Sequence, residues 1–418
     1  MKIKTREMPL EKVLSLPTPE HKKPLKPNIF FRTLIRLLSI PDLRAVRFRH
    51  SEHQMEKAGK GPYLILMNHS CFLDPKIAYK ILYPLPFNIV VTTDSFVGLG
   101  WLMRLIGCIP TQKYVTDIRL ITDMLYALKK KKCSVLMYPE AGYSFDGRAV
   151  TMPKKLGALI KKLDVPVLSI ITDGAFLRDP LYNGLQKRKV NVSAKLTCLL
   201  SREEIAEKSV EEIDAVLEEA FSFDAFAGQY KNRIEIKEPF RADGLHRILY
   251  RCPHCGEEQM EGKGVSLSCH ACGKEYEMDT LGRLKAKEGE TAFAHIPDWY
   301  DWERSEVRKE LTEGRYRLEL DVDVAVLCDY KALYRVGSGK LIHDENGFAL
   351  TGYDGMLDYR QSPTASFSLN ADFFWYEIGD VICIGNKERL YYCFPRQKNV
   401  VTKARFAAEE LFKIKTSK

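Results

Sequence analysis

The sequence predicts an α/β domain with a mixed, largely parallel sheet and helices on both sides, followed by a small cysteine-rich segment and a C-terminal antiparallel β-roll or barrel that ends in a helix. Three observations lead to this prediction. Strand-like and helix-like segments alternate from about residue 60 to 235, two Cys-x-x-Cys pairs lie between residues 252 and 272, and the apolar period becomes two beyond residue 317. We place the domains at residues 1–55, 56–240, 246–285 and 300–418.

The composition indicates a globular protein. With 418 residues, of which 45% are apolar and 11% aromatic, the chain is large enough to bury several cores. It contains no run of 18 apolar residues, and its charged start is not followed by an apolar segment with a cleavage site. We therefore expect neither a membrane-spanning helix nor a secretory signal, and we expect the protein in the cytoplasm.

Residues 1–55 are interpreted as a basic N-terminal segment. The first 50 residues hold twelve Lys and Arg against four Asp and Glu, so +8 of the total charge of +9 lies here. Within residues 28–41, one helical face carries the apolar residues Phe30, Phe31, Leu34, Leu37 and Leu38, while Arg32 and Arg36 lie on another.

Two interpretations of this amphipathic helix stay open. A basic amphipathic helix is typical of an element on a membrane surface, here one rich in anionic lipids on the cytoplasmic face. Alternatively, the apolar face packs on the next domain and the arginines are solvated. We expect no nucleic-acid partner, because the basic residues are not spread along a groove-forming domain.

The α/β domain is predicted from alternating elements. Strands are expected at residues 61–68, 87–93, 133–139, 165–172 and 189–200, and helices at 117–132 and 153–163. Ser201 with Glu204 and Ser209 with Glu212 fit the Ser-x-x-Glu capping box, which predicts two closing helices, the second reaching about residue 230.

The first predicted strand ends in Asn68 and His69, with Asp74 five residues further on. His69 and Asp74 can meet if the histidine lies in the turn and the aspartate starts the following helix. A histidine oriented by a carboxylate can act as a general base, a role worth about 10² to 10⁴ in rate. The alternatives are a solvated turn pair, or a Cys-His nucleophile formed by Cys71, which lies only two residues from His69.

Four segments then resemble one family. "NHSCFLD" (residues 68–74) resembles the His-x4-Asp signature of the phospholipid/glycerol acyltransferases, the lysophosphatidate acyltransferase superfamily. "GCIPTQK" (107–113), "YPEAGYS" (138–144) and "VPVLSI" (165–170) are similar to the family's second, third and fourth blocks, in the same order. The resemblance covers about residues 27–235.

The resemblance implies roles for the matching residues. His69 would be the general base that takes the proton of the acceptor's hydroxyl as this group attacks an acyl thioester, and Asp74 would hold the imidazole. Transfer would be direct, so Ser70 and Cys71 would have no nucleophilic role. The implied substrate-binding residues are Lys113, Glu140, Gly142, Ser144 and Arg148.

Two departures from the family pattern concern the acceptor. Ala141, Gly142 and Tyr143 stand where the third block usually carries Gly-Thr-Arg, and Lys113 stands where the second block has a phosphate-binding arginine. Lysine offers a point charge where arginine offers a bidentate fork. Either Arg148 compensates from the neighbouring loop, or the acceptor is not a simple phosphomonoester.

The function expected from the resemblance is an O-acyltransferase of phospholipid biosynthesis. The donor would be an acyl thioester, acyl-CoA or acyl-carrier protein, and the acceptor a lysophospholipid such as 1-acylglycerol-3-phosphate. The alternatives are a non-catalytic lipid-binding or regulatory protein on the same fold, and an acyltransferase for a non-phosphate acceptor. No bound redox or nucleotide group is indicated.

The 11 cysteines fall into two groups. Seven stand singly in apolar surroundings, as is typical of reduced, buried thiols. The other four form two pairs with thirteen residues between them: Cys252, Cys255, Cys269 and Cys272. Such pairs predict a zinc ribbon with tetrahedral Zn²⁺, which would be structural because four thiolates leave no open position. His254 and His270 are spare, and the alternative is two fortuitous reduced pairs.

The C-terminal residues 300–418 are predicted to be rich in β-structure. Residues 317–326 alternate apolar and polar side chains, "DENG", "GYDG" and "EIGD" supply turns, and residues 403–414 are expected to form a closing helix. In layout this resembles a pleckstrin-homology-type domain.

Overall fold

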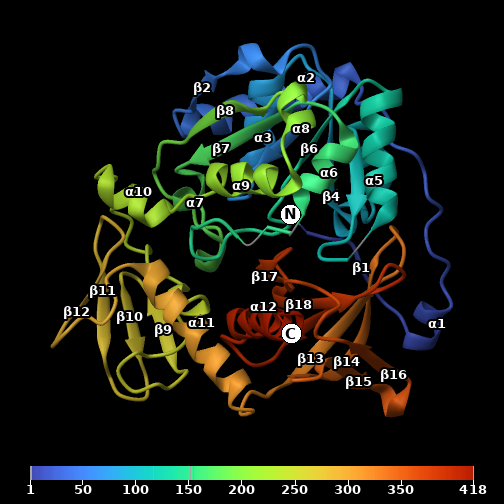
Figure 1. The fold of residues 1–418 in the computed structure, drawn as a ribbon. Helices are drawn as coiled ribbons and strands as arrows, with labels where there is room; N and C mark the ends of the chain where they lie inside the picture. The colour runs from blue at the N-terminus through green and yellow to red at the C-terminus, as the bar shows by residue number, and fades with distance from the viewer. Residues whose placement is uncertain (1, 116, 151, 154, 418) are drawn as a thin grey trace. The chain divides into compact units, whose positions relative to one another are not determined.

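The protein is described by a computed structural model that covers residues 2–115, 117–150, 152, 153 and 155–417. The chain folds into two compact units (Figure 1). The α/β unit comprises Glu20–Asp179 and Lys187–Ala225, and the C-terminal unit comprises Met1–Pro19, Pro180–Gln186 and Phe226–Lys418.

The α/β unit is built on a seven-stranded sheet in the order β2-β8-β7-β3-β6-β4-β5. Neighbouring strands run parallel, except that β8 is antiparallel to β7. This confirms the predicted mixed, largely parallel sheet. The strands are β2 (Arg49–His53), β3 (Leu64–Met67), β4 (Phe87–Thr92), β5 (Cys108–Thr111), β6 (Ser134–Met137), β7 (Val167–Asp173) and β8 (Ser193–Leu200).

Two of these strands, β2 and β5, were missed in the sequence. Residues 49–53 read Arg-His-Ser-Glu-His, an exposed edge strand with no apolar residue to give a period. Residues 108–111 are short and contain Pro110, which is unusual inside a sheet and fits the edge position of β5.

Helices cover both faces of the sheet because the side chains of each strand alternate between two cores. In β3, Ile65 and Met67 join one cluster with α2 and α3, while Leu64 and Leu66 join another with α5, α6, α8 and α9. The helices of this unit are α2 (Ile29–Ala45), α3 (Asp74–Leu82), α4 (Gly100–Leu105), α5 (Ile118–Leu125), α6 (Leu156–Leu163), α7 (Ala175–Arg178), α8 (Arg202–Glu207) and α9 (Val210–Ala220).

Both predicted capping boxes are present, at the starts of α8 and α9. The prediction that the second closing helix reaches about residue 230 was wrong, because α9 ends at Ala220 and α10 (Ala225–Lys231) is a separate helix. Residues 223–225 pair instead with the loop at 147–149, since Ala149 N donates to Phe223 O and Ala225 N donates to Gly147 O. The predicted helix at 117–132 is α5 followed by a π-helical turn at Tyr126–Lys130.

The C-terminal unit contains two antiparallel systems. The smaller is a four-stranded sheet in the order β12-β11-β10-β9, and the larger runs β16-β15-β14-β13-β19-β18-β17. The strands of the smaller sheet are β9 (Met260–Lys263), β10 (Ser266–Cys269), β11 (Glu275–Met278) and β12 (Leu284–Ala286). Those of the larger are β13 (Leu318–Leu327), β14 (Leu333–Asp344), β15 (Gly347–Gly352), β16 (Leu357–Gln361), β17 (Asn370–Trp375), β18 (Gly379–Gly385) and β19 (Leu390–Pro395).

The larger sheet confirms the predicted antiparallel β-structure with a terminal helix. Its first strand, β13, lies between β14 and the last strand, β19. Helix α11 (Ile296–Thr312) precedes the sheet and α12 (Val401–Thr416) follows it. Among the described residues no ladder joins β16 to β17, so the roll is open there. The likeness to a pleckstrin-homology-type domain stays a prediction.

The structure divides the N-terminal segment that the sequence suggested as one part, residues 1–55. Strand β1 (Thr5–Glu7) pairs in parallel with residues 333–335 of β14, and α1 (Leu10–Leu14) buries Leu10 and Val13 in the C-terminal unit. The segment from Glu20 onward belongs to the α/β unit. The start of the chain therefore packs in the C-terminal unit through two buried apolar side chains, whereas helix α2 belongs to the other unit.

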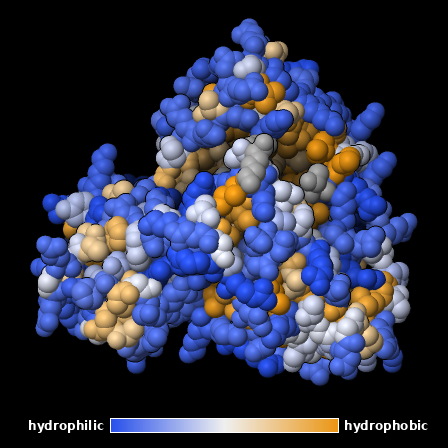
Figure 2. Space-filling view, turned by 60° about the horizontal axis from the view of Figure 1, so that its bottom comes forward, coloured by the Kyte–Doolittle hydropathy of each residue, from blue (hydrophilic) through white to orange (hydrophobic). Residues whose placement is uncertain are grey.

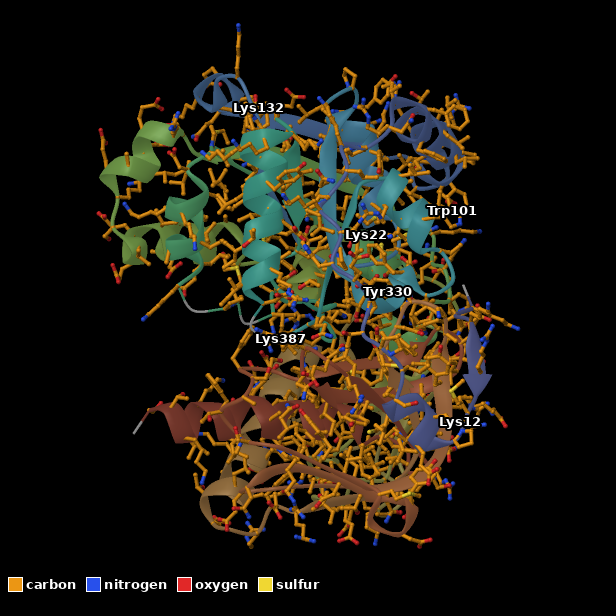
Figure 3. All side chains as sticks on the ribbon, turned by 90° about the vertical axis from the view of Figure 1, so that its right-hand side faces the viewer. Lys12, Lys22, Trp101, Lys132, Tyr330 and Lys387 are labelled. Carbon is orange, nitrogen blue, oxygen red and sulfur yellow. The ribbon has the colours of Figure 1, made fainter. Side chains whose placement is uncertain are left out.

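We predict that Leu10→Ala destabilises the C-terminal unit, because it removes a side chain that is 2% exposed. The expected loss in the free energy of unfolding is about 2–5 kcal/mol. Lys12→Ala, on the exposed side of α1 (Figure 3), is the matched control and should change it by about 0.5 kcal/mol or less. Denaturant titration measures both, and equal midpoints for the two variants would contradict the assignment.

Candidate functional site

The structure brings His69 and Asp74 together at the carboxyl end of the central strand β3. His69 lies in the turn after β3, Asp74 is the first residue of α3, and Asp74 Oδ2 lies 2.9 Å from His69 Nδ1. Asn68 fixes the start of this turn, because its Oδ1 accepts hydrogen bonds from the main-chain N–H (2.8 Å) and the hydroxyl (3.1 Å) of Thr172 in β7. The pair thus sits where ligand crevices form in α/β sheets.

The hydrogen bonds of Asp74 decide which imidazole nitrogen carries the proton. Its Oδ2 also accepts from the main-chain N–H groups of Ser70 (2.8 Å) and Cys71 (3.1 Å). Two N–H donors already point at Oδ2, so this oxygen acts as the acceptor for Nδ1–H of His69 as well. Nε2 of His69 is therefore left with a lone pair, which is the form that a general base needs.

Burial changes the pKa of both groups. Asp74 is fully buried, and this raises the pKa of its carboxyl to about 8, although the N–H groups of Ser70 and Cys71 pull that pKa down. Burial, together with the positive charge of Lys113, lowers the pKa of His69 well below its ordinary value. The imidazole is therefore neutral at neutral pH and ready to accept a proton.

Cys71 faces the protein interior. It is 1% exposed, and its Sγ lies 4.0 Å from Asp74 Oδ1 and accepts from the main-chain N–H of Leu73. Burial and the carboxylates of Asp74 and Asp179 raise the pKa of the Cys71 thiol well above its ordinary value. A protonated, buried thiol is a poor nucleophile, so the geometry disfavours a Cys-His pair.

Glu140 positions His69 through the main chain. Its side chain is fully buried, Oε2 accepts from His69 N (2.9 Å), and Oε1 accepts from Val150 N (2.9 Å). The family resemblance associates this residue with the acceptor, whereas both oxygens here bond main-chain N–H groups. Glu140 is thus a positioning residue that links the turn after β3 to the loop after β6.

Two tyrosine rings enclose the imidazole of His69. The Tyr138 ring lies 4.0 Å from the His69 ring (centroid to centroid) with an interplanar angle of 22°, and the Tyr143 ring lies 3.8 Å away at 25°. The His69 side chain is 15% exposed. Because both faces of the ring are stacked, a substrate can approach Nε2 only at the ring edge. Sequence reasoning missed this arrangement, since nothing in the spacing of the three residues indicates a stack.

The other predicted substrate-binding residues follow β5 or lie in the loop after β6. Lys113 Nζ is 6.0 Å from the centroid of the Tyr143 ring, and no ion pair joins Lys113 to a carboxylate of the described residues. Arg148 Nε donates to Asp146 Oδ2 (2.7 Å), so this guanidinium is already paired.

Ser144 and Gly142 shape that loop. The Ser144 hydroxyl donates to Arg148 O (2.6 Å) and accepts from Gly147 N (2.9 Å), and Ser144 N donates to His69 O (3.3 Å). A Cβ at Gly142 would lie 2.9 Å from the hydroxyl of Tyr114, so only glycine fits there without a shift. The structure therefore gives both residues a role in the loop's conformation.

In the first turns of helix α2 the apolar side chains point outward, while Arg32 and Arg36 contact the α/β unit. Phe30, Leu37 and Leu38 are 64%, 54% and 66% exposed. Arg32 is buried and donates to Pro84 O (2.7 Å), and the Arg36 guanidinium lies 4.4 Å from the Tyr83 ring centroid. The alternative in which the apolar face packs on the domain and the arginines are solvated is therefore wrong.

The neighbouring helix α4 also exposes a large apolar side chain. Its last residue, Leu105, accepts a hydrogen bond from Asn28 N at the start of α2, and its Trp101 is 65% exposed (Figure 3). None of the helices in the described ranges has the length and apolarity needed to cross a bilayer. The face seen in Figure 2 is mostly hydrophilic with separate hydrophobic patches.

The four cysteines predicted as metal ligands form one cluster at the small sheet. All four Sγ atoms lie within 4.8 Å of one another, with Cys252–Cys272 at 3.8 Å and Cys255–Cys269 at 3.7 Å. A tetrahedron with metal–sulfur bonds of about 2.3 Å has edges of about 3.8 Å, so the thiols fit Zn²⁺.

The two halves of this cluster have the same local geometry. Gly256 N donates to Cys252 O and Gly273 N donates to Cys269 O, each at 2.9 Å. Both glycines have positive φ, of 81° and 73°, which explains why glycine follows each pair. His270 lies outside the cluster, paired with Glu261 at 3.0 Å.

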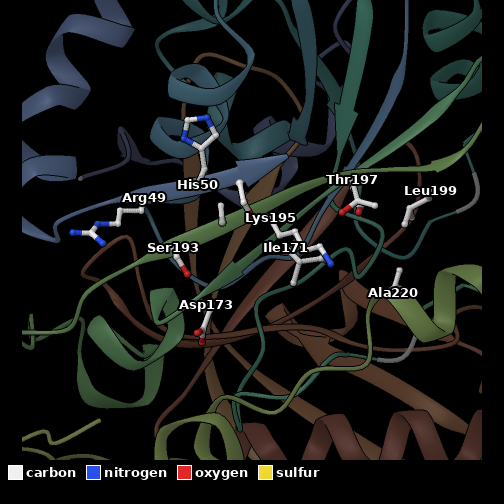
Figure 4. Close-up of a pocket in the computed structure, with 12 residues that line it drawn as sticks. Arg49, His50, Ile171, Asp173, Ser193, Lys195, Thr197, Leu199 and Ala220 are labelled. Atoms are coloured by element: carbon white, nitrogen blue, oxygen red, sulfur yellow. The ribbon is translucent and has the colours of Figure 1, made fainter. Parts of the chain in front are cut away.

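A separate hollow of about 520 Å³ lies over β2, β7 and β8 (Figure 4). Its lining combines charged side chains, such as Arg49, Asp173 and Lys195, with the apolar Ile171 and Leu199. It includes none of the candidate site residues.

Comparisons with known proteins point to the same part of the chain. Residues 46–173 match the family model described as Acyltransferase, and this range contains His69, Asp74, Lys113 and Glu140. Comparison with curated proteins gives no match. Among solved structures, the 1-acyl-sn-glycerophosphate (LPA) acyltransferase PlsC from Thermotoga maritima is 17% identical, with 46% of this chain and 81% of that chain covered and a TM-score of 0.32. A similarity this low carries no argument about the present chain.

Proposed function

We propose that this protein is a peripheral membrane O-acyltransferase that moves a fatty acyl group from an acyl thioester, acyl-CoA or acyl-carrier protein, to the hydroxyl of a lysophospholipid in phospholipid biosynthesis. The observation that carries the proposal is the His69–Asp74 pair, whose Nδ1–Oδ2 contact of 2.9 Å leaves Nε2 as a base. The match of residues 46–173 to the Acyltransferase family supports it.

The proposed reaction is a direct transfer. The acceptor's hydroxyl oxygen attacks the thioester carbonyl carbon while its proton passes to Nε2 of His69, and the negative charge of Asp74 stabilises the imidazolium that forms. The tetrahedral intermediate then collapses, the carbon–sulfur bond breaks, and the imidazolium returns the proton to the leaving thiolate. The products are an ester and a free thiol, and no residue of the protein is acylated.

We further propose that α2 and α4 dock the α/β unit on the cytoplasmic face of a membrane. The outward apolar face supplies insertion energy that does not depend on salt, because burying one such side chain contributes about 1.5–3 kcal/mol. The neighbouring Lys22, Lys23 and Lys26 are exposed and favour anionic lipids, each by about 1 kcal/mol near the surface. Docked in this way, the protein would take a lysophospholipid acceptor directly from the membrane.

The cysteine cluster is proposed to hold one structural Zn²⁺. The fit of the Sγ–Sγ distances supports this metal, and four thiolates leave no coordination position for a reacting ligand. When bound, the ion would cross-link the loops that carry the two pairs and stabilise the small sheet, without a part in acyl transfer.

The first prediction of this proposal concerns the catalytic pair. His69→Ala should lower the rate of acyl transfer by about 10² to 10⁴ in protein that remains folded. The wild-type kcat/KM should rise with pH up to about 8, because loss of the Asp74 proton creates the charge that stabilises the imidazolium. Initial rates with a labelled acyl thioester, corrected for uncatalysed hydrolysis, measure both effects.

Asp74→Asn is the matched control for that pH dependence. An amide oxygen can replace Oδ2 and accept the same three N–H groups, so the imidazole orientation is kept while the charge is lost. The rate should fall and the rise toward pH 8 should disappear. A His69→Ala enzyme with most of its activity would refute the mechanism.

The second prediction concerns the membrane. Phe30→Asp combined with Leu38→Asp should weaken binding to anionic vesicles at least about tenfold, at low and at high salt, because it removes apolar contact. Met356→Asp is the matched control, since Met356 is also exposed (52%) but lies in the C-terminal unit. Vesicle sedimentation measures the partition. If the α2 variant binds vesicles as well as the wild type and the Met356 variant binds them less, the membrane-binding surface lies on the C-terminal unit and the proposal is wrong.

The third prediction concerns the metal. Protein purified under reducing conditions should contain about one zinc per chain by elemental analysis. Cys252→Ser with Cys269→Ser should lose the metal and lower the unfolding temperature, whereas His270→Ala should keep it, because this histidine lies outside the cluster. Zinc-free wild-type protein, or a double variant that retains zinc, would disprove the site.

A further inference from the structure

Tyr143 forms the outer wall of the space around the proposed base. Its ring stacks on His69 at 3.8 Å, lies 5.9 Å from the ring of Phe72, and has Lys113 Nζ 6.0 Å from its centroid. Phe72 is 55% exposed. On this side the His69 ring therefore has a phenol, an exposed phenyl ring and the ammonium group of Lys113 close to it.

The second stacked ring, Tyr138, has a different environment. It packs against the hydrophobic core between the sheet and α3, and its hydroxyl is buried with no hydrogen-bond partner among the described residues. Tyr138 is thus the inner wall, which supports the imidazole from the core side. Both tyrosines are half-buried, and Tyr143 is the one that also lies beside the exposed Phe72 and beside Lys113.

The loop holds Tyr143 in place rather than leaving it to move freely. Glu140, three residues before it, bonds the main chain of His69 (2.9 Å), and Ser144, directly after it, donates to His69 O (3.3 Å). Ala141 adopts a φ of +54°, a left-handed conformation that residues with a Cβ rarely adopt. A strained turn between two anchors is consistent with a ring fixed over the base.

The charges around this wall favour an acceptor with little negative charge. Asp74 and Glu140 are fully buried and are hydrogen-bonded to His69. Arg148 is paired with Asp146, so Lys113 is the cation next to Tyr143 that has no carboxylate partner in the described part of the chain. A doubly charged phosphate is held best by the bidentate fork of a guanidinium, and neither a phenol nor a single ammonium provides one.

We infer that Tyr143, with Lys113, selects an acceptor whose group at this wall carries a single negative charge, namely a lysophospholipid with a phosphodiester, over one with a phosphomonoester. This inference rests on the proposed acyl transfer and narrows its acceptor. Tyr143 is thereby assigned as a specificity-determining residue.

The test compares two acceptors of equal chain length in the same detergent micelles: 1-acylglycerol-3-phosphate, a phosphomonoester, and 1-acylglycerophosphoglycerol, a phosphodiester. The wild-type kcat/KM should be at least about tenfold higher for the phosphodiester. Tyr143→Arg should shift this ratio by about tenfold or more toward the phosphomonoester, because it adds a bidentate donor. Tyr143→Phe keeps the ring and should leave the ratio within about threefold.

A binding measurement separates this inference from the proposed function. The affinity of the wild-type protein for each lysolipid, measured without an acyl donor, should show the same preference as the rates. If wild-type protein transfers acyl groups to neither lipid while binding still favours the phosphodiester, the proposed function fails and the selectivity stands. Two results together would overturn the inference. The wild-type protein would bind and acylate the phosphomonoester as well as or better than the phosphodiester, and Tyr143→Arg would leave the ratio of the two unchanged.

Discussion

The turn after β3 depends on two buried carboxylates. Asp74 bonds the ring of His69 and the main-chain N–H groups of Ser70 and Cys71, and Glu140 bonds the main-chain N–H of His69. The imidazole and the backbone that carries it are therefore fixed independently, one from α3 and one from the loop after β6. The orientation of Nε2 and the stack with Tyr143 both follow from this double attachment.

The buried carboxyl of Asp74 lowers the free energy of unfolding at the pH where it is ionised and can stabilise an imidazolium. Burial raises the pKa of Asp74 from 3.8 to about 8, so the folded state disfavours the ionised carboxylate. The contribution of Asp74 to folding is therefore most favourable at low pH and is lost progressively as pH rises from about 4 toward about 8. A buried acid with this cost is typical of a functional site, because a core selected for stability alone would not retain it.

The sequence could predict elements whose signal is local. The apolar runs of β3, β6 and β7, both capping boxes and the cysteine spacing each depend on a few neighbouring residues, and the meeting of His69 with Asp74 follows from a strand, a turn and a helix start. The pairing of β1 with β14 could not be predicted, since it joins residues more than 300 positions apart through main-chain atoms. Helical periodicity placed the apolar face of α2 but carries no information about whether that face points inward. The stack of Tyr138 and Tyr143 on His69 depends on how two loops meet, which spacing does not encode.

In the proposed mechanism the acyl group passes directly from the thioester to the acceptor. Intact-protein mass spectrometry on rapidly quenched reactions, with the lipid products counted in parallel, tests it most directly. A labelled acyl thioester alone should leave the protein mass unchanged, and addition of a lysophospholipid should yield labelled diacyl product and free thiol in equal amounts. An acylated protein that forms before the product, carrying the label on Cys71, or the absence of any labelled lipid, would contradict it.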